Sequence, residues 1–165
     1  MLKYRRLSPE ELNALEDEFV KFLATQSITA PDWVKIKKEN ANKQNELIDL
    51  FSNIVMERVL SSIEYLEIST QDEIRVFKME EERGRLVGLS FKNKGVNLTD
   101  DKLLNELFSN PKELLKHQPE VYTLEKKYTK TKAEECFFLV NLGATVTNKN
   151  IYDFIGSLLP GPESN

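Results

Sequence analysis

The chain has 165 residues, of which 40% are hydrophobic and 30% are charged, and its formal net charge is −4. These values are typical of a globular domain, and they exclude both a disordered chain and a protein that binds nucleic acid or anionic lipid through a strongly basic overall charge. The single cysteine excludes an internal disulfide, and together with the single histidine it excludes a Cys/His zinc site within one chain.

The sequence contains no segment typical of membrane insertion or secretion. No apolar run approaches the roughly 18 residues that a helix needs to cross a bilayer. Acidic residues follow the basic N-terminus, at the place where a signal peptide has its apolar region. A lone cysteine also fits a reducing compartment. We therefore expect a cytoplasmic protein.

The first predicted helix, residues 8–24, begins with a strong capping signal. Ser8 is placed as the N-cap, Pro9 takes the first helical position, and Glu11 completes a capping box with Ser8. The apolar residues of this segment recur at helical spacing and form one stripe: Leu12, Leu15, Phe19, Phe22 and Leu23.

A second predicted helix, residues 29–38, repeats this signal in the stretch SITAPDW. Thr29 is the expected cap, and Asp32 is its partner in the capping box. Trp33, the only tryptophan, is spaced from Ile28 as the second member of a hydrophobic staple. We therefore interpret Trp33 as an anchor at a helix start rather than as the floor of a ligand site.

A third helix is predicted to begin near residue 41 and to carry apolar residues on one face as far as Val59. Near residue 63 the apolar period changes to that of strands. Residues 63–69, 73–80 and 85–92 are predicted to be three strands. The links between them are short and polar, which favours an antiparallel meander.

The elements predicted after the meander are two helices, a strand and a final helix: residues 99–108, 110–117, 121–128 and 147–158. Thr99 and Thr147 are the expected caps of the first and last of these helices. Residues 132–142 are ambiguous, because the run CFFLV is also typical of a buried strand. We favour a helix, since Ala133-Glu-Glu135 suits a first turn and Gly143 suits the left-handed position after a helix end.

Together these elements predict an α+β fold. We expect an N-terminal helical unit packed on a small, mainly antiparallel sheet, with C-terminal helices. The chain shows neither an internal repeat nor an interdomain linker, so residues 1–160 are expected to form a single α+β domain. Residues 161–165 are expected to be a frayed tail.

Most of the chain resembles a family of small proteins that are common in Bacteroidota and are catalogued as a domain of unknown function. The runs that carry the resemblance are KYRRLSPEELNALEDEFVKFL, ITAPDWVKIK, LIDLFSNIVMERVL, VYTLEKKYTKTKAEE and LGATVTNKNIYDFI. The resemblance implies a small single-domain cytosolic protein, and it transfers no functional residue.

The common catalytic motifs are absent from the sequence. Neither a Gly-rich phosphate loop nor GxSxG nor HExxH occurs. Cys136 and His117 are the only residues of their kinds, and as a nucleophile and base they would have to meet in space. The apolar neighbours of Cys136 favour a buried structural thiol instead. We therefore expect no catalytic, cofactor-binding or metal-binding residues.

Three carboxylate clusters have simple structural interpretations. Asp100-Asp101 and Glu134-Glu135 fall in predicted first turns, where negative charge offsets the helix dipole. The third cluster, Glu80-Glu81-Glu82, falls in a predicted turn and is interpreted as solvated surface.

Two basic stretches are candidate contact sites for a partner. Arg5 and Arg6 are suited to bind phosphates or carboxylates through bidentate hydrogen bonds. The alternative, which we favour, is that both arginines pair with acidic residues of the following helix.

The second basic stretch combines lysines with aromatic residues in a predicted strand and the loop after it. This pattern is typical of proteins that stack single-stranded RNA on aromatic rings. The alternative is a solvated strand edge, where lysines prevent edge pairing. The candidate contact residues are Tyr122, Lys126, Lys127, Tyr128, Lys130 and Lys132.

The leading functional hypothesis is a non-catalytic cytosolic module for protein interaction or regulation, whose partner is another protein. It predicts an exposed apolar patch with an aromatic or arginine anchor. One alternative is an RNA-associated accessory protein that uses residues 126–132, and a second is a small enzyme of an unrecognised type. We expect no cofactor and no membrane partner.

Overall fold

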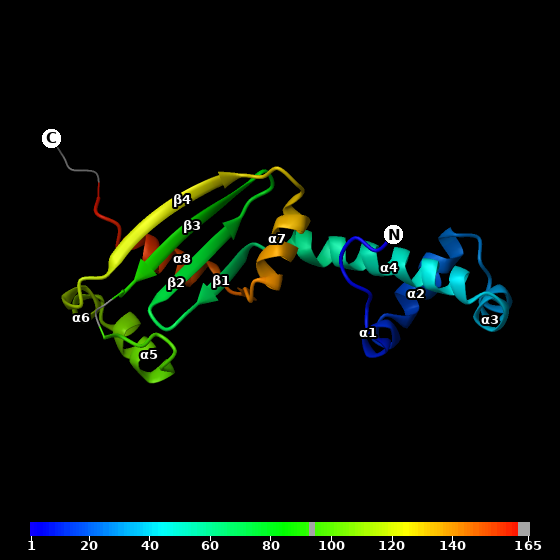
Figure 1. Cartoon of the computed structure of the whole chain (residues 1–165), viewed down its shortest axis with the longest axis horizontal. Coiled ribbons are helices and arrows are strands. Elements are labelled where there is room, and N and C mark those ends of the chain that lie inside the picture. The colour runs from blue at the N-terminus through cyan, green and yellow to red at the C-terminus, as the bar shows by residue number, and fades with distance from the viewer. Residues whose placement is uncertain (93–94, 162–165) are drawn as a thin grey trace. The chain divides into compact units, whose positions relative to one another are not determined.

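The computed structural model describes residues 1–92 and 95–161, and within them it contains eight helices and a five-stranded antiparallel sheet (Figure 1). The predicted α+β class is therefore confirmed. The chain divides into two compact units, Met1–Val59 and Leu60–Asn165, and the division falls within helix α4 (Ala41–Ser62). The packing of the helical unit on the sheet as one domain stays a prediction. Most of the predicted tail lies outside the described residues.

The first predicted helix is divided in the structure. It forms α1 (Pro9–Ala14) and α2 (Glu16–Thr25), so the prediction of one helix over residues 8–24 is wrong at Leu15. Leu15 leaves the helical region, with φ −109° and ψ 26°. Its N–H is shared between two carbonyls of α1, and its carbonyl accepts a hydrogen bond from the Phe19 N–H. The helix therefore bends at one residue while these hydrogen bonds persist, and the apolar spacing does not encode such a bend.

Both capping boxes predicted in this unit are confirmed. The Glu11 N–H donates to the Ser8 hydroxyl at 3.2 Å, and the Ser8 N–H donates to the Glu11 carboxylate at 2.8 Å. Thr29 and Asp32 exchange the same pair of bonds at the start of α3 (Ala30–Glu39). Each box satisfies two backbone N–H groups at a helix start and fixes where that helix begins.

Trp33 packs within the helical unit. Its half-buried ring lies edge-to-face against Phe19 of α2, with 5.2 Å between the ring centroids. The ammonium of Lys37 lies 5.8 Å from the centroid of the indole. Phe19 also contacts the buried ring of Phe51 on α4, at 5.0 Å. This packing supports the interpretation of Trp33 as a helix anchor, whereas a contact with Ile28 stays a prediction.

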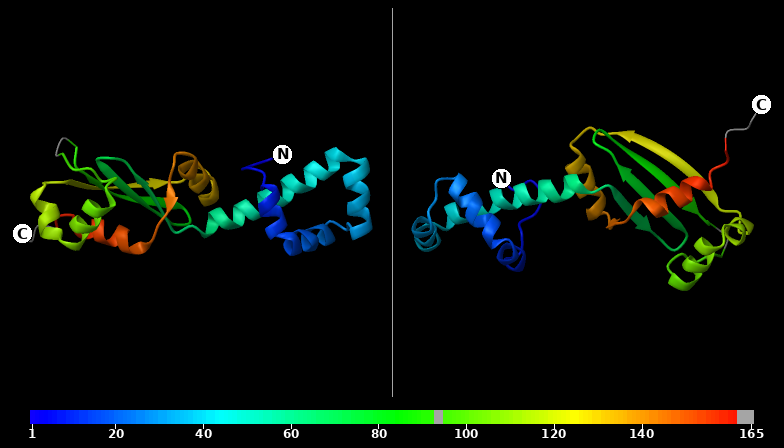
Figure 2. Two further views of the ribbon diagram at one scale, coloured as in Figure 1. Left: turned by 90° about the horizontal axis from the view of Figure 1, so that it is seen from below. Right: turned by 180° about the vertical axis from the view of Figure 1, so that it is seen from behind.

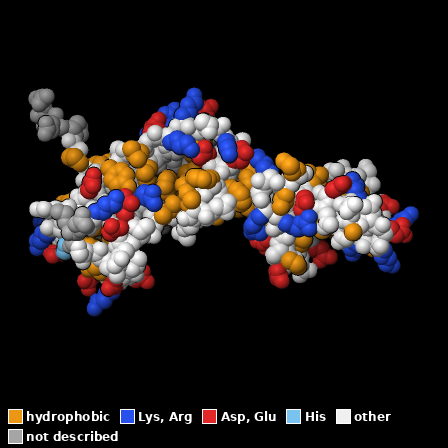
Figure 3. All heavy atoms as spheres, in the orientation of Figure 1, with side chains coloured by type: hydrophobic (Ala, Val, Ile, Leu, Met, Phe, Trp, Pro, Cys, Tyr) orange, Lys and Arg blue, Asp and Glu red, His pale blue; other side chains and the backbone are white. Residues whose placement is uncertain are grey.

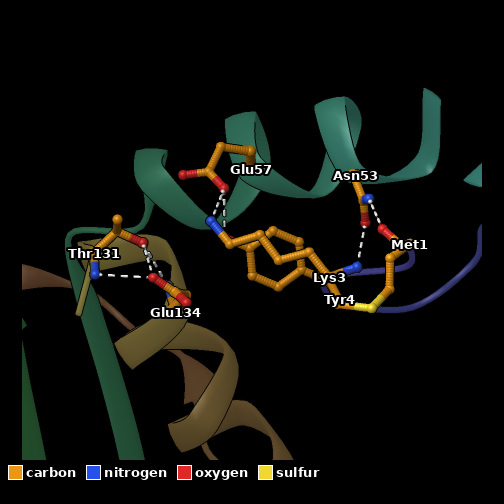
Figure 4. A network of polar contacts seen from close by, with 7 residues as sticks. All are labelled: Met1, Lys3, Tyr4, Asn53, Glu57, Thr131 and Glu134. Atoms are coloured by element: carbon orange, nitrogen blue, oxygen red, sulfur yellow. Dashed lines mark hydrogen bonds and ion pairs between the residues drawn. The ribbon is translucent and has the colours of Figure 1, made fainter. Parts of the chain in front are cut away.

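Polar contacts hold the N-terminal segment against α4 (Figure 4). The Lys3 N–H donates to Asn53 Oδ1 at 2.8 Å, and Asn53 Nδ2 donates to the Met1 carbonyl at 3.0 Å. The Lys3 ammonium and the Tyr4 hydroxyl both bind the Glu57 carboxylate. Tyr4 is also buried, so this segment forms part of the helical unit's core.

Ser52 on α4 is fully buried and ties the same segment to the helix. Its Oγ accepts a hydrogen bond from the Leu7 N–H at 3.1 Å and donates to the Ile48 carbonyl at 2.7 Å. In the variant S52A, the buried Leu7 N–H has no acceptor, so we expect the free energy of unfolding to fall by roughly 1–3 kcal/mol. Urea denaturation followed by circular dichroism measures this change.

The matched control is S61A, which removes an exposed hydroxyl from the same helix. We expect it to change the free energy of unfolding by less than about 0.5 kcal/mol. Equal effects of S52A and S61A would contradict the role that we assign to Ser52.

The sheet has the strand order β4-β3-β2-β1-β5, and every neighbouring pair is antiparallel. The antiparallel meander predicted for β1 to β3 is confirmed, although β3 begins two residues earlier than predicted because the turn before it is shorter. The sequence does not predict β5, since two residues are too few to show an alternating pattern. The bounds are β1 (Tyr65–Ser69), β2 (Glu73–Met79), β3 (Arg83–Ser90), β4 (Glu120–Lys127) and β5 (Thr145–Val146).

The helices of this unit are α5 (Asp101–Ser109), α6 (Pro111–Lys116), α7 (Lys132–Asn141) and α8 (Lys149–Ser157). The helix favoured for residues 132–142 is therefore confirmed, and Thr131 caps it in a box with Glu134 (Figure 4).

The caps predicted for α5 and α8 are wrong by one residue. Asp100, rather than Thr99, accepts the first N–H groups of α5, because the Thr99 hydroxyl instead donates to an asparagine before it. Asn148, rather than Thr147, caps α8. The Thr147 N–H donates to the Tyr65 carbonyl, so the chain is still bound to the sheet at that point.

The two faces of the sheet are covered differently, and α7 and α8 lie on opposite sides of it (Figure 2, left). One face is packed under α5, α6 and α8 and forms the core of this unit. Its strand residues alternate along β2 and β3 and are paired across them, with Ile74 opposite Leu89 and Val76 opposite Val87. The other face is covered only in part, and it is the one turned to the viewer in Figure 1.

Candidate functional site

The incompletely covered face, which we call the open face, consists of rows of side chains that run across the sheet. One row places Phe77, Leu86 and Leu124 side by side on β2, β3 and β4. The next row places Arg75, Gly88 and Tyr122 on the same strands. Figure 3 shows hydrophobic side chains gathered over the strands on this side of the molecule. Leu124 keeps 61% of its surface exposed, so the apolar row is accessible to solvent.

Tyr122 lies flat on the backbone of β3 at Gly88. A Cβ atom added to Gly88 would overlap three carbons of the Tyr122 ring, all well within the 3.0 Å that real Cβ contacts keep. The Tyr122 hydroxyl donates to the carboxylate of Glu73 on β2, so the side chain spans three strands. Burial, together with this hydrogen bond, raises the pKa of Tyr122 to about 12. The phenol therefore remains protonated at neutral pH.

Tyr128 repeats this arrangement at the other end of β3. Its ring lies against Gly84, where an added Cβ would stand 3.2 Å from Tyr128 Cε1. Its hydroxyl lies 3.8 Å from the Met79 sulfur. Burial raises the pKa of Tyr128 above its usual value. Glycine is required at Gly88, because a side chain there would occupy the space of the Tyr122 ring, whereas at Gly84 an added Cβ would only be tightly packed against Tyr128.

An apolar groove of about 360 Å³ lies between the open face and α7. Its sheet side includes Phe77, Leu86 and Leu124, and its helix side includes Phe138 and Leu139. Phe138 is 57% exposed although it is a large aromatic residue on a helix that packs against the sheet. Hollows of this size that are lined by apolar and aromatic side chains are typical binding sites.

The charged residues that line the groove neutralise one another. The Lys126 ammonium lies 2.8 Å from the carboxylate of Glu135, which is largely buried. Arg85 and Glu125 also border the groove, but alternation places their side chains on the other face of the sheet, where they lie 3.5 Å apart. The groove therefore presents an apolar surface without a net charge.

The structure does not gather the predicted lysine tract into one surface. Lys126 and Lys127 point to opposite faces of β4, because side chains alternate along a strand. Lys126 is already paired with Glu135, and Lys130 is exposed in the segment between β4 and α7. Lys132 is the first residue of α7. Only Tyr122, Lys126 and Tyr128 of the six predicted contact residues lie on the open face or line its groove.

Arg5 and Arg6 bind acidic residues within their own compact unit. Both terminal nitrogens of Arg5 bind the Glu11 carboxylate, each at 2.7 Å, and this pairing lowers the pKa of Glu11 to about 2. Arg6 binds Asp49 at 2.6 Å and Asn45 at 3.0 Å. Arg5 therefore pairs with the following helix as expected, whereas the expectation is wrong for Arg6, which pairs with α4 instead. A contact of either arginine with a partner stays a proposal.

Cys136 and His117 are separated in the fold. The ring of His117 contacts Phe91 before the start of β4, whereas Cys136 lies near Tyr128 after its end. The eight residues of β4 span roughly 26 Å at about 3.3 Å per residue. Burial also raises the pKa of the Cys136 thiol to about 11. A reactive thiolate paired with His117 is therefore not supported by the structure.

The carboxylate clusters have structural partners, as the sequence indicated for the helix starts. Asp100 caps α5, Glu134 caps α7, and Glu135 binds Lys126. In the turn cluster, Glu80 binds Arg85 at 3.3 Å. Within the described residues, no group of three or more Cys, His, Asp and Glu side chains is placed to hold a metal ion.

A model of a family of unknown function, DUF6495, matches residues 1–160. The chain belongs to this family. The resemblance to a catalogued domain of unknown function is thus confirmed, and its occurrence in Bacteroidota stays a prediction. A search of characterised proteins and a search of solved structures gave no match to the chain. None of the helices in the described part of this family member is long and apolar enough to cross a membrane.

Several groove residues could not be identified from the sequence. Phe138 and Leu139 have the same apolar character as the residues that α7 buries, so their exposure depends on how the helix packs. Lys126 and Glu135 belong to different elements, and their pairing depends on the tertiary fold. The available signal was Gly88, since a glycine inside a predicted strand indicates a bulge or a close contact.

We expect the variant G88A to force the Tyr122 ring off the sheet and to lower the free energy of unfolding by roughly 1–3 kcal/mol. Chemical denaturation of G88A in the native and Y122A backgrounds forms a double-mutant cycle. The cost of G88A should be smaller when the ring is absent. The control is G156A in α8, where an added Cβ meets its nearest atom at 4.0 Å. An equal cost of G88A in both backgrounds would contradict the contact.

Proposed function

We propose that this DUF6495 protein is a non-catalytic protein-interaction module, and that its apolar groove binds a partner protein through one or two large apolar side chains. The observation that carries the proposal is the joint exposure of Leu124 and Phe138 across one groove, at 61% and 57%. Exposed apolar surface on both walls of a hollow is typical of a binding site rather than of ordinary surface.

The charge of the groove supports an apolar anchor on the partner. A nucleic acid would need unpaired cations for its phosphates, whereas Lys126, whose side chain lies on the groove side of β4, is paired with Glu135. An aliphatic or aromatic side chain needs no such cation and would remove Leu124 and Phe138 from water. At about 360 Å³, the groove accommodates an anchor of one or two side chains rather than a whole helix face.

The fixed tyrosines support a pre-formed site. Tyr128 is held over Gly84, and Tyr122 is held over Gly88 by its hydrogen bond to Glu73. Side chains fixed in this way lose little further freedom when a ligand binds, which favours affinity. The cytoplasmic location that we expect from the sequence is part of this proposal.

Selection of a displayed random peptide library on the full chain tests the proposal. We expect the enriched peptides to share one or two large apolar residues. Calorimetry of one enriched synthetic peptide should show binding that weakens roughly tenfold or more in F138S, because an anchor pocket carries most of the affinity. The control is L142S, which changes a residue of similar exposure, 59%, outside the groove lining.

Two outcomes would contradict the groove proposal. The first is that no peptide is enriched, or that binding of the enriched peptide is the same in F138S and L142S. The second is that a single-stranded RNA binds the chain with strong salt dependence and loses affinity in a K127E/K130E variant. That result would favour the RNA alternative, in which the exposed lysines are the contact residues.

A further inference from the structure

The two edges of the sheet differ in how they are protected from pairing with another strand. The edge strand β5 is only two residues long, which is a common way to prevent pairing. The opposite edge strand, β4, has eight residues and keeps a continuous register with β3, without a bulge. It contains no proline, and Pro119 stands just before its first residue. Apart from its charged side chains, the β4 edge therefore lacks the features that usually prevent pairing with another strand.

The backbone groups that β4 leaves unpaired can be identified from one hydrogen bond. The Tyr128 N–H donates to the Glu82 carbonyl at the end of the β3–β4 register. Since N–H and C=O groups alternate in direction along a strand, the even-numbered residues of β4 face β3. The outward groups therefore belong to the odd-numbered residues: Val121, Thr123, Glu125 and Lys127.

We propose that β4 pairs with β4 of a second copy of this chain, antiparallel and with Thr123 opposite the partner's Thr123. In this two-fold register, the outward N–H and C=O groups of one β4 lie opposite those of the other, as antiparallel hydrogen bonding requires. Val121 then lies opposite the partner's Glu125, and each such pair exchanges two backbone hydrogen bonds. The result is a continuous ten-stranded sheet, twice the five strands of one chain, with both open faces on the same side.

The side chains of β4 match in this register. Glu120 lies opposite the partner's Lys126, so opposite charges meet at both ends of the pairing. Tyr122 lies opposite the partner's Leu124, which places an aromatic–aliphatic pair side by side at the junction of the two sheets. Lys126 retains its pairing with Glu135, since an ammonium has three donors.

Neighbouring registers are less favourable. Centring the pairing on Leu124 places Tyr122 opposite the partner's Lys126 and leaves Glu120 without a basic residue opposite it. Centring it on Glu125 places two carboxylates directly opposite each other, which is destabilising. Of these registers, only the one centred on Thr123 pairs Glu120 with the partner's Lys126. The charges of β4 that protect this edge against other strands therefore favour pairing with a second copy of the chain.

This inference does not rest on the groove, because the edge and the groove are tested with different residues. Sedimentation analysis of the full chain over a dilution series gives the mass in solution. T123P removes an outward N–H that β3 does not use, and T123V keeps that N–H and serves as its matched control. E120K changes an exposed side chain and places two basic residues opposite each other. Circular dichroism and the melting temperature establish that each variant remains folded.

We expect the native chain and T123V to form dimers reversibly, and T123P and E120K to weaken dimerisation roughly tenfold or more. Under mild oxidation, T123C should form a disulfide between chains, because directly opposite Cα atoms lie about 5.5 Å apart. V121C should not, since its equivalents are four residues out of register. The native Cys136 is buried and does not compete.

Either of two results would overturn the proposal. One is the mass of a single chain for the native protein at every concentration. The other is undiminished dimerisation of E120K and of folded T123P. A cross-link in V121C but not in T123C would likewise overturn the register that we assign.

Discussion

The contact of the Tyr122 ring with Gly88 determines how accessible the open face of the sheet is. A side chain on β3 at this position would hold the ring away from the strands, whereas glycine lets it lie flat across them. The hydroxyl then reaches Glu73 on β2, so one side chain of the edge strand is fixed to the centre of the sheet. Tyr128 makes a similar contact with Gly84. Because both rings lie against the strands, the open face beside α7 stays accessible.

The accessible face and the edge of β4 are consequences of the same strand geometry. Alternation assigns Tyr122, Leu124 and Lys126 to the open face, while the backbone groups of the residues between them point away from β3. The groove thus uses the side chains of β4, and the proposed pairing with a second copy uses its backbone. Both proposals describe recognition by a pre-formed surface, and neither requires a reactive group. This agrees with the raised pKa of the Cys136 thiol and with its distance from His117.

The parts of the structure that depend on local interactions could be predicted from the sequence. The capping boxes at Ser8 and Thr29 and the antiparallel meander follow from hydrogen-bonding side chains, turn residues and a period of two. The bend at Leu15 could not be placed because apolar spacing does not encode it. The caps of α5 and α8 could not be placed because adjacent residues compete for the same N–H groups, and the outcome depends on what else Thr99 and Thr147 bind. For the site, the sequence indicated Tyr122, Lys126 and Tyr128. It did not indicate the groove, which exists only where α7 meets the sheet.

The central claim is that the open face is accessible to solvent, and side-chain footprinting with hydroxyl radicals on the dilute full chain tests it most directly. Leu124 and Phe138 should be oxidised at rates typical of exposed residues of their types. Leu89 and Ile155, which are fully buried on the other face, should be protected. Protection of Leu124 and Phe138 to the level of Leu89 and Ile155 would show that the face is covered and would contradict the account.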